Sequence, residues 1–332
     1  MSPIKINSMK QLNKPQVIVS FPVEAFALEA LREHYDVHYV PVVADRQALI
    51  DQIGDRIDAV ITNGSFGWPG ELMRQMPKLK IIAAFGVGYE NIDAVSAKEL
   101  GLAVVHGRGT NTNSVADHAL ALLFAIVRDI VQSEQGLRAG GWKGIRSPRP
   151  DISGRRLGIF GMGAIGRAIA KRCEAFDMQI YYHNRNKDQT SPYGYVSSLL
   201  ELAQQVDFLI CAAPGGAATH HLVNAQVLQA LGGSGYLVNV GRGSVVDTDA
   251  LAQCLNNKAI AGAALDVFEG EPKMPEILQN VQNLIVTPHI AGFSPNSFAA
   301  YLKSVIDNID ACLSGKPLIT PIPWPMNNHG LL

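Results

Sequence analysis

Short apolar runs alternate with amphipathic stretches along almost the whole chain, which is typical of a parallel α/β sheet with helices on both faces. One series of these runs lies within residues 16–106 and a second within residues 156–289. Two series predict two doubly wound units. The predicted strands are 16–20, 37–40, 58–62, 80–86 and 103–106 in the first unit, and 156–160, 179–183, 207–213, 235–241, 262–268 and 283–289 in the second.

Two longer segments have the pattern of helices. Residues 116–138 read as one very apolar helix, which suggests packing between domains or subunits. Residues 294–315 begin with a Ser cap and a Pro in the first turn, and they carry an apolar stripe on one face. Because the first unit lacks a closing element, we expect this last helix to pack back on it. The predicted domains are therefore 1–108 with 292–332, and 109–291.

Composition narrows the class of protein. The 28 basic and 29 acidic residues nearly cancel, so no overall field favours nucleic acid or a membrane surface. The four cysteines are far apart and form no CxxC pair, which argues against a zinc site or a disulfide framework. The first twenty residues lack the apolar core of a signal peptide. We expect a cytoplasmic protein.

A glycine-rich turn follows the predicted strand 156–160. Gly161, Gly163 and Gly166, with Ala164 and Ile165 between them, form a GxGxxG motif at the start of a helical pattern. Such glycines allow a tight turn and close approach of the backbone to a pyrophosphate at the helix N-terminus. A glycine-rich turn can also serve packing alone, but here the strand and the helix that the motif requires are both present.

The end of the next predicted strand identifies the nucleotide. An enzyme that prefers NAD carries Asp or Glu there, to bind the ribose 2′-hydroxyl. This chain carries His183, Asn184 and Arg185, followed closely by Lys187. Asn184 can donate to a 2′-phosphate and the two basic side chains can pair with its charge, which predicts NADP(H). The alternative is that Arg185 and Lys187 are solvated loop charges.

Three polar residues lie at the ends of apolar runs in the second unit: Arg242, Glu271 and His289. Ligands bind at the carboxyl ends of strands in such sheets. These residues stand in NVGRGSVVD, LDVFEGEP and VTPHIAGFSP, and together with GMGAIG and FGVGYENID these stretches resemble the D-isomer-specific 2-hydroxyacid dehydrogenase family from about residue 58 to 315. The resemblance implies a flavodoxin-like substrate domain, a Rossmann cofactor domain and an active site in the cleft between them.

The resemblance also implies residue roles. His289 would protonate the carbonyl oxygen as hydride arrives, and Glu271 would pair with it and stabilise its protonated form. Arg242 would hold the carboxylate of a 2-oxo acid with two planar donors, a geometry that Lys cannot copy. The amides of Val87 and Gly88 would complete the carboxylate cradle. The nicotinamide would lie near Thr112, Val115, Ala116, Asp117 and Asp266. The resemblance gives Val240, Gly241 and His289 as further cofactor-binding residues.

Other histidines and metal have no assigned part in this chemistry. His118, His220 and His221 are interpreted as structural or peripheral, because the motifs give them no paired carboxylate. Arg242 and His289 already supply charge and proton, and no HExxH or similar ligand spacing occurs. We therefore expect no metal site.

The substrate is narrowed by similarity within the family. FGVGYENID, the HNR segment and GFSPNS are most similar to the glyoxylate and hydroxypyruvate reductase branch, with 2-ketogluconate reductases as the alternative. Glu271 argues against a formate dehydrogenase, and the short C-terminal end disfavours phosphoglycerate dehydrogenase. AAPGGAATHHLVN replaces the usual Pro-Leu-Thr loop. The expected pocket walls are Asn63, Gly64, Ser65, Phe66, Trp142 and Phe293.

Family-like corepressors offer a different class of function, a cofactor-sensing binding protein, but the long tails of such proteins are absent from this sequence. A homodimer is expected by resemblance, and the apolar segment 118–127 is consistent with a buried interface.

Overall fold

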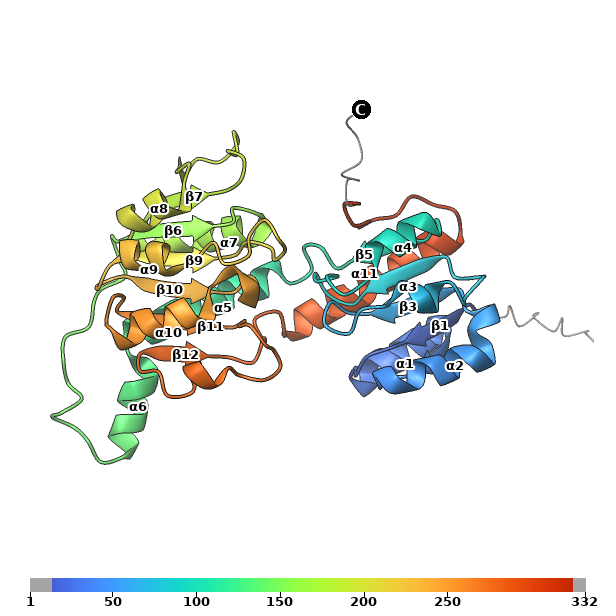
Figure 1. Cartoon of the computed structure of the whole chain (residues 1–332), viewed down its shortest axis with the longest axis horizontal. Helices are drawn as coiled ribbons and strands as arrows, with labels where there is room; N and C mark the ends of the chain where they lie inside the picture. The colour runs from blue at the N-terminus through green and yellow to red at the C-terminus, as the bar shows by residue number, and fades with distance from the viewer. Residues whose placement is uncertain (1–13, 325–332) are drawn as a thin grey trace, which may run out of the picture. The chain divides into compact units, whose positions relative to one another are not determined.

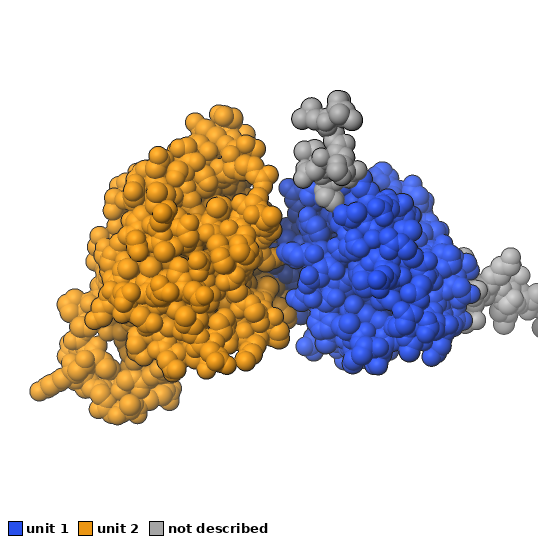
Figure 2. Space-filling model, viewed as in Figure 1, with its two compact units in different colours: residues 1–111, 295–332 blue, residues 112–294 orange. Residues whose placement is uncertain are grey.

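The computed structural model describes residues 14–324, and the chain divides into two units that are coloured separately in Figure 2. Unit 1 comprises residues 1–111 and 295–332, and unit 2 comprises residues 112–294. Each change of unit lies three residues beyond the boundary expected at 108 and at 291. Unit 1 is thus discontinuous in sequence.

Unit 1 is built on a five-stranded parallel sheet (Figure 1). Its strand order, β2-β1-β3-β4-β5, is that of flavodoxin-like sheets. The strands are β1 (Gln16–Val19), β2 (Asp36–Tyr39), β3 (Ala59–Thr62), β4 (Ile81–Ala84) and β5 (Ala103–His106), and the helices between them are α1 (Ala25–His34), α2 (Arg46–Ile53), α3 (Gly70–Met73) and α4 (Ala94–Glu99). Strands β3 and β4 are buried throughout, as their continuous apolar runs predict.

The last helix, α11 (Pro295–Leu313), belongs to unit 1 and packs on β4 and β5. Its stripe buries Tyr301, Val305 and Ile309 in the same core as Tyr35. The Tyr35 hydroxyl donates to Asp310 Oδ1 at 2.8 Å, which ties α11 to the end of α1. The apolar stripe at helical spacing thus explains why the chain returns to its first unit.

Unit 2 contains a seven-stranded parallel sheet with the order β12-β11-β10-β9-β6-β7-β8. Read from β8, this is the 3-2-1-4-5-6 order of dinucleotide-binding sheets with one added strand. The strands are β6 (Arg156–Phe160), β7 (Gln179–His183), β8 (Gly194–Tyr195), β9 (Phe208–Cys211), β10 (Tyr236–Asn239), β11 (Gly262–Leu265) and β12 (Leu284–Val286). The two-residue strand β8 is too short to leave a hydrophobic pattern and was not predicted.

Helices cover both faces of the second sheet (Figure 1). They are α5 (Thr112–Val127), α6 (Ile130–Arg138), α7 (Ala164–Cys173), α8 (Leu199–Gln205), α9 (Ala225–Leu231) and α10 (Thr248–Asn256). Short 3₁₀ turns occupy Val43–Asp45, Gly54–Arg56, Glu174–Phe176, Gly243–Val245 and Glu276–Leu278. The prediction of a doubly wound α/β fold with two parallel sheets is confirmed.

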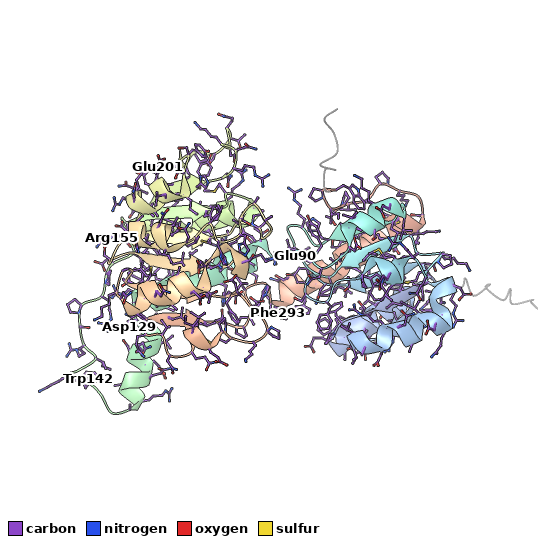
Figure 3. The ribbon with its side chains drawn as sticks, viewed as in Figure 1. Glu90, Asp129, Trp142, Arg155, Glu201 and Phe293 are labelled. Atoms are coloured by element: carbon purple, nitrogen blue, oxygen red, sulfur yellow. The ribbon has the colours of Figure 1, made fainter. Side chains whose placement is uncertain are left out.

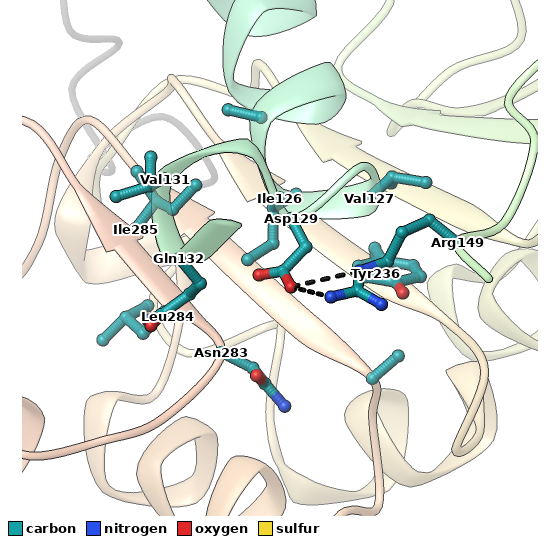
Figure 4. Close-up of a pocket in the computed structure, with 12 residues that line it drawn as sticks. Ile126, Val127, Asp129, Val131, Gln132, Arg149, Tyr236, Asn283, Leu284 and Ile285 are labelled. Carbon is teal, nitrogen blue, oxygen red and sulfur yellow. Dashed lines mark hydrogen bonds and ion pairs between the residues drawn. The ribbon is translucent and has the colours of Figure 1, made fainter. Parts of the chain in front are cut away.

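The single helix predicted over 116–138 is wrong, because the chain breaks it between α5 and α6. Asp129 takes the left-handed conformation, with φ 53°, which ends one helix and turns the next away. Figure 4 shows its carboxylate paired with the Arg149 guanidinium, whose Nε donates at 3.0 Å. This pair borders a pocket of about 210 Å³ that includes Tyr236 and Asn283, at the amino-terminal edge of the sheet.

Between residues 14 and 324, no helix combines the length and the apolar character needed to cross a membrane.

Candidate active site

The glycine-rich turn lies at the carboxyl end of β6, where the strand order reverses between β6 and β9. Gly161 has φ 101°, and a Cβ there would lie 2.6 Å from the Ala213 amide nitrogen in the loop after β9. A Cβ on Gly166 would lie 2.2 Å from the Gly161 carbonyl oxygen. Both glycines are therefore needed for close packing of strand, loop and helix.

Gly163 has a different role, because a Cβ there would meet no atom within 4 Å. It precedes α7, whose first amides, including those of Ala164 and Ile165, have no intrahelical partner, and no side chain caps them. An open backbone turn before an uncapped helix N-terminus fits a pyrophosphate. The turn thus has the shape and polarity that a dinucleotide requires.

The end of β7 lies directly beside this turn. Asn184 Oδ1 accepts from the Met162 amide at 2.7 Å, which holds the Asn side chain against the glycine-rich turn. His183 Nδ1 lies 2.9 Å from the Val196 carbonyl oxygen, and its ring packs near Phe160. Arg185 is exposed. The predicted HNR segment therefore lies directly beside the glycine-rich turn.

A carboxylate does follow this segment, at Asp188, but other groups engage it. Arg167 of α7 forms an ion pair with Asp188, and Thr190 donates to it at 2.7 Å. The hydrogen bonds from Thr190, with the nearby Arg167, lower the pKa of Asp188 below its usual value. This pair was not predicted from the sequence, because the partners belong to different elements.

The catalytic pair predicted from sequence forms in unit 2. His289 Nδ1 lies 2.7 Å from Glu271 Oε2, and Glu271 Oε1 accepts from the Phe268 amide at 2.9 Å. Burial alone would raise the pKa of the Glu271 carboxyl, but the hydrogen bonds from His289 and Phe268 and the charges of His289 and Arg242 outweigh it and lower the pKa. Glu271 is therefore ionised at neutral pH and orients the imidazole.

Arg242 follows β10 on a short, tightly bonded turn. Its Nη1 donates to the Gly241 carbonyl at 2.7 Å. Asn239, which is fully buried, donates from Nδ2 to the Arg242 carbonyl at 3.0 Å and accepts from the Gly241 amide at 3.1 Å. Asn239 was not predicted as a site residue, although it lies in the same motif as Arg242.

Asp266 is 1% exposed and holds the loop that carries His289. Its carboxylate accepts from the Thr287 hydroxyl at 2.6 Å and from the amides of Ile290 and Ala291 at 2.9 Å each. The Asp266 carbonyl also accepts from the His289 amide at 2.9 Å. Asp266 was predicted to lie near the nicotinamide. Within residues 14–324, its carboxylate accepts the hydrogen bonds from Thr287, Ile290 and Ala291.

The backbone of His289 has φ 55°, an unfavourable value for a residue with a side chain. Such a conformation persists only where the surroundings impose it. The bonds from Asp266 supply that constraint, and Ser114 Oγ, near the start of α5 at Thr112, donates to the Ala291 carbonyl at 2.7 Å. The loop that carries His289 is thus fixed by Asp266, directly after β11, and by Ser114, in the first turn of α5.

Two of the histidines interpreted as structural or peripheral have carboxylate neighbours that their motifs did not reveal. His118 Nε2 lies 3.4 Å from Asp266 Oδ1 and 3.1 Å from Thr287 Oγ1. His221 Nε2 lies 2.7 Å from Glu269 Oε1. Both partners are more than 45 residues away in sequence, so no local motif could have revealed them.

In unit 1, the expected substrate residues lie on two loops that pack together. A Cβ on Gly64 would lie 2.7 Å from the Gly88 carbonyl carbon, so the loop that contains Ser65 touches the turn after β4. His106 Nδ1 lies 2.8 Å from the Val87 carbonyl oxygen. Because this bond fixes the Val87–Gly88 peptide plane, it also aims the Gly88 amide.

Trp142, expected in the pocket wall, is placed elsewhere in its unit. It lies in the exposed loop after α6, on the side of the sheet away from the glycine-rich turn, and its side chain is labelled in Figure 3. The helix break at Asp129 and the Arg149 pair direct this loop toward the amino-terminal edge. Trp142 therefore does not join His289 within unit 2.

Comparison with known proteins agrees with this geometry. Residues 120–291 match the family described as "D-isomer specific 2-hydroxyacid dehydrogenase, NAD binding domain". Hydroxyphenylpyruvate reductase of Plectranthus scutellarioides is 36% identical over 92% of this chain and 98% of its own, and 2-ketogluconate reductase of Gluconobacter oxydans is 33% identical over 93% and 99%.

A solved structure shows the same likeness. The NADPH-dependent glyoxylate/hydroxypyruvate reductase of Sinorhizobium meliloti, in complex with NADP and malonate, superposes with a TM-score of 0.86 at 39% identity, covering 93% of this chain and 97% of that one. Both units are therefore represented in the likeness.

The lowered pKa of Glu271 predicts how stability depends on pH. Its stabilising contribution is complete above the ordinary value of 4.5 and is lost as pH falls through the lowered value. Glu271→Gln should lower the free energy of unfolding by about 1 kcal/mol at pH 7. Below pH 4.5, the free energy of unfolding should fall less steeply with pH in this variant than in the natural chain. Urea unfolding across pH 3 to 7 measures this, with the exposed Glu276→Gln as control. Equal acid sensitivity of the Glu271→Gln variant and the natural chain would contradict it.

Proposed function

The chain belongs to the D-isomer specific 2-hydroxyacid dehydrogenase family, and we propose that it reduces small 2-oxo acids, above all glyoxylate and hydroxypyruvate, to D-2-hydroxy acids with NADPH. The observation that carries this proposal is the His289–Glu271 pair, with the Nδ1 to Oε2 distance of 2.7 Å, near the charge of Arg242. His289 supplies a proton, and Arg242 supplies a binding group for the substrate carboxylate. A 2-oxo acid needs both in order to accept a hydride.

Each residue has a distinct part in this proposal. Glu271 accepts from His289 Nδ1, so the opposite nitrogen, Nε2, is the one that donates a proton to the substrate oxygen. Arg242 binds the substrate carboxylate. The cofactor, when bound, supplies the hydride. On unit 1 we assign the amides of Val87 and Gly88, with Ser65, as further substrate contacts.

The preference for NADPH rests on the end of β7. Asn184 is held against the glycine-rich turn, and the exposed Arg185 follows it. The nearest downstream carboxylate, Asp188, is engaged by Arg167 and Thr190, so its charge is partly neutralised. A cationic rather than anionic group beside the ribose favours a 2′-phosphate.

Arg185→Ala tests the cofactor. We expect the KM for NADPH to rise about tenfold, the value of one charge-assisted contact, with little change for NADH. Initial rates at varied cofactor measure this. The matched control is Arg155→Ala, which removes an exposed arginine near the amino-terminal end of β6 (Figure 3). If NADH serves the natural chain as well as NADPH does, the proposed preference is wrong.

The choice of substrate rests on the relatives. Of the three proteins compared, the NADPH-dependent glyoxylate/hydroxypyruvate reductase has the highest sequence identity to this chain. The 2-ketogluconate and hydroxyphenylpyruvate reductases define the alternative substrates. A 2-ketogluconate reductase needs room for a long polyol, and a hydroxyphenylpyruvate reductase needs room for a ring. A cofactor-sensing binding protein, the other class of function, would turn over none of these acids.

His289→Asn tests the chemistry. Removing the proton donor should lower kcat by about 10²–10⁴-fold and leave the cofactor KM nearly unchanged, while His34→Asn on the exposed end of α1 should have no effect. Rates with glyoxylate, hydroxypyruvate, 2-ketogluconate and hydroxyphenylpyruvate rank the substrates in the same assay. Turnover that survives in the His289→Asn variant would refute the assigned role.

A homodimer is also part of the proposal, but its support lies in α6 rather than α5. The apolar side chains of α5, including Leu122 and Leu123, are buried within unit 2. Ile130 and Leu137 of α6 are instead 53% and 51% exposed, and Trp142 in the next loop is 62% exposed. Exposed apolar groups clustered on one helix and its loop favour burial against a second copy.

Leu137→Glu tests this interface. A buried charge should dissociate the dimer, so the mass measured by light scattering after size-exclusion chromatography should fall by half. Leu200→Glu on α8, at a residue that is 37% exposed, controls for the charge itself. A monomeric natural chain would contradict the proposal.

A further inference from the structure

A second histidine–glutamate cluster lies close to the candidate active site but is not part of it. His220 and His221 lie in the loop between β9 and α9, and Glu269 lies in the turn after β11. One donor atom from each of the three side chains lies within 4.8 Å of the other two. The group is thus small enough for one ion, and it is partly exposed rather than sealed in the core.

The backbone brings the two imidazoles to the same side. His221 has φ 51°, a value that only a constrained non-glycine residue adopts. Its amide donates to the Ser244 carbonyl at 2.9 Å, and the His220 amide donates to the Gly216 carbonyl at 3.1 Å. The rings consequently stack, with centroids 3.9 Å apart and planes 26° from parallel. Adjacent side chains in extended backbone would point apart.

The carboxylate is prepared in the same way. Glu269 Oε2 accepts from Thr248 Oγ1 at 2.7 Å and from the Thr248 amide at 3.2 Å, while Oε1 faces His221 Nε2. A carboxylate oriented by an outer hydrogen bond is the usual arrangement around a metal ligand.

We propose that His220, His221 and Glu269 bind one divalent transition-metal ion of the zinc class, through two imidazole nitrogens and one carboxylate oxygen. Imidazole favours zinc, copper and nickel over magnesium and calcium. Metal bonds of about 2.0–2.2 Å at a tetrahedral angle require donors about 3.3–3.6 Å apart, whereas His221 Nε2 and Glu269 Oε1 are 2.7 Å apart. A small opening of partly exposed side chains is sufficient, and solvent completes the coordination.

The ion would join the loop after β9 to the turn that leads to the catalytic glutamate. Glu269 is two residues before Glu271. At the other end of the same loop, a Cβ on Gly215 would lie 3.0 Å from Arg242 Cγ. The expectation of no metal site came from spacing along the sequence, in which Glu269 is 48 residues from His221.

His220 separates this proposal from a simpler one. If the cluster only joins the loop after β9 to the turn after β11, the His221–Glu269 hydrogen bond is sufficient for that structural role. His220 then contributes no more than ring stacking. If the cluster binds metal, His220 is a ligand, and its loss removes one of three donors. A change at His220 should therefore weaken metal binding while leaving the His221–Glu269 hydrogen bond intact.

The experiment is isothermal titration calorimetry of the full chain, free of any affinity tag and stripped with a chelator, against Zn²⁺ at pH 7.5. One zinc per chain is expected, with no heat from Mg²⁺. His220→Gln and Glu269→Gln should each weaken binding at least about tenfold, and His34→Gln should not.

Thermal unfolding in chelator shows whether each variant folds as the natural chain does. Absence of stoichiometric zinc binding, an unchanged affinity in His220→Gln, or an equal loss in His34→Gln overturns the proposal. None of these measurements depends on turnover, so they stand apart from the tests of the proposed function.

Discussion

The candidate site depends on the hydrogen bonds that the Asp266 carboxylate accepts from the loop that carries His289. This carboxylate is buried at the end of β11 and accepts from a hydroxyl and two amides of the loop 287–291. A buried carboxylate without such donors would be costly, so the loop and the charge stabilise each other. The loop holds His289 at φ 55°, and the imidazole Nδ1 lies 2.7 Å from Glu271 Oε2. The proposed proton donor is therefore positioned by a residue that need not touch substrate.

The turn after β11 carries two glutamates with different partners. Glu271 faces His289, whereas Glu269 faces His221 and the start of α10 at Thr248. In both, hydrogen bonds overcome the effect of burial and keep the carboxylate ionised. The turn thus connects the chemistry at one end of the sheet with the loop after β9, whose sequence departs from the usual Pro-Leu-Thr pattern. This connection gives that unusual loop a physical role.

The glycine-rich turn illustrates how packing and binding share the same residues. Gly161 and Gly166 lack room for a Cβ, while Gly163 faces open space. Packing alone would explain the first two but not the third. Together with the uncapped start of α7, Gly163 is the feature that distinguishes a nucleotide turn from a packing turn.

The sequence by itself determined the two-unit α/β fold and the pairing of His289 with Glu271. Eleven of the twelve strands within residues 14–324 have apolar runs that lie within three residues of their final bounds. These are local patterns or motifs, and buried strands must be apolar wherever they occur. Only the tertiary structure decided the helix break at Asp129 and the placement of Trp142. It also decided which groups hydrogen-bond to the Asp266 carboxylate and that His221 pairs with Glu269. Each depends on side chains that are distant in sequence, and a one-dimensional pattern does not record which of them meet when strands are ordered in a sheet.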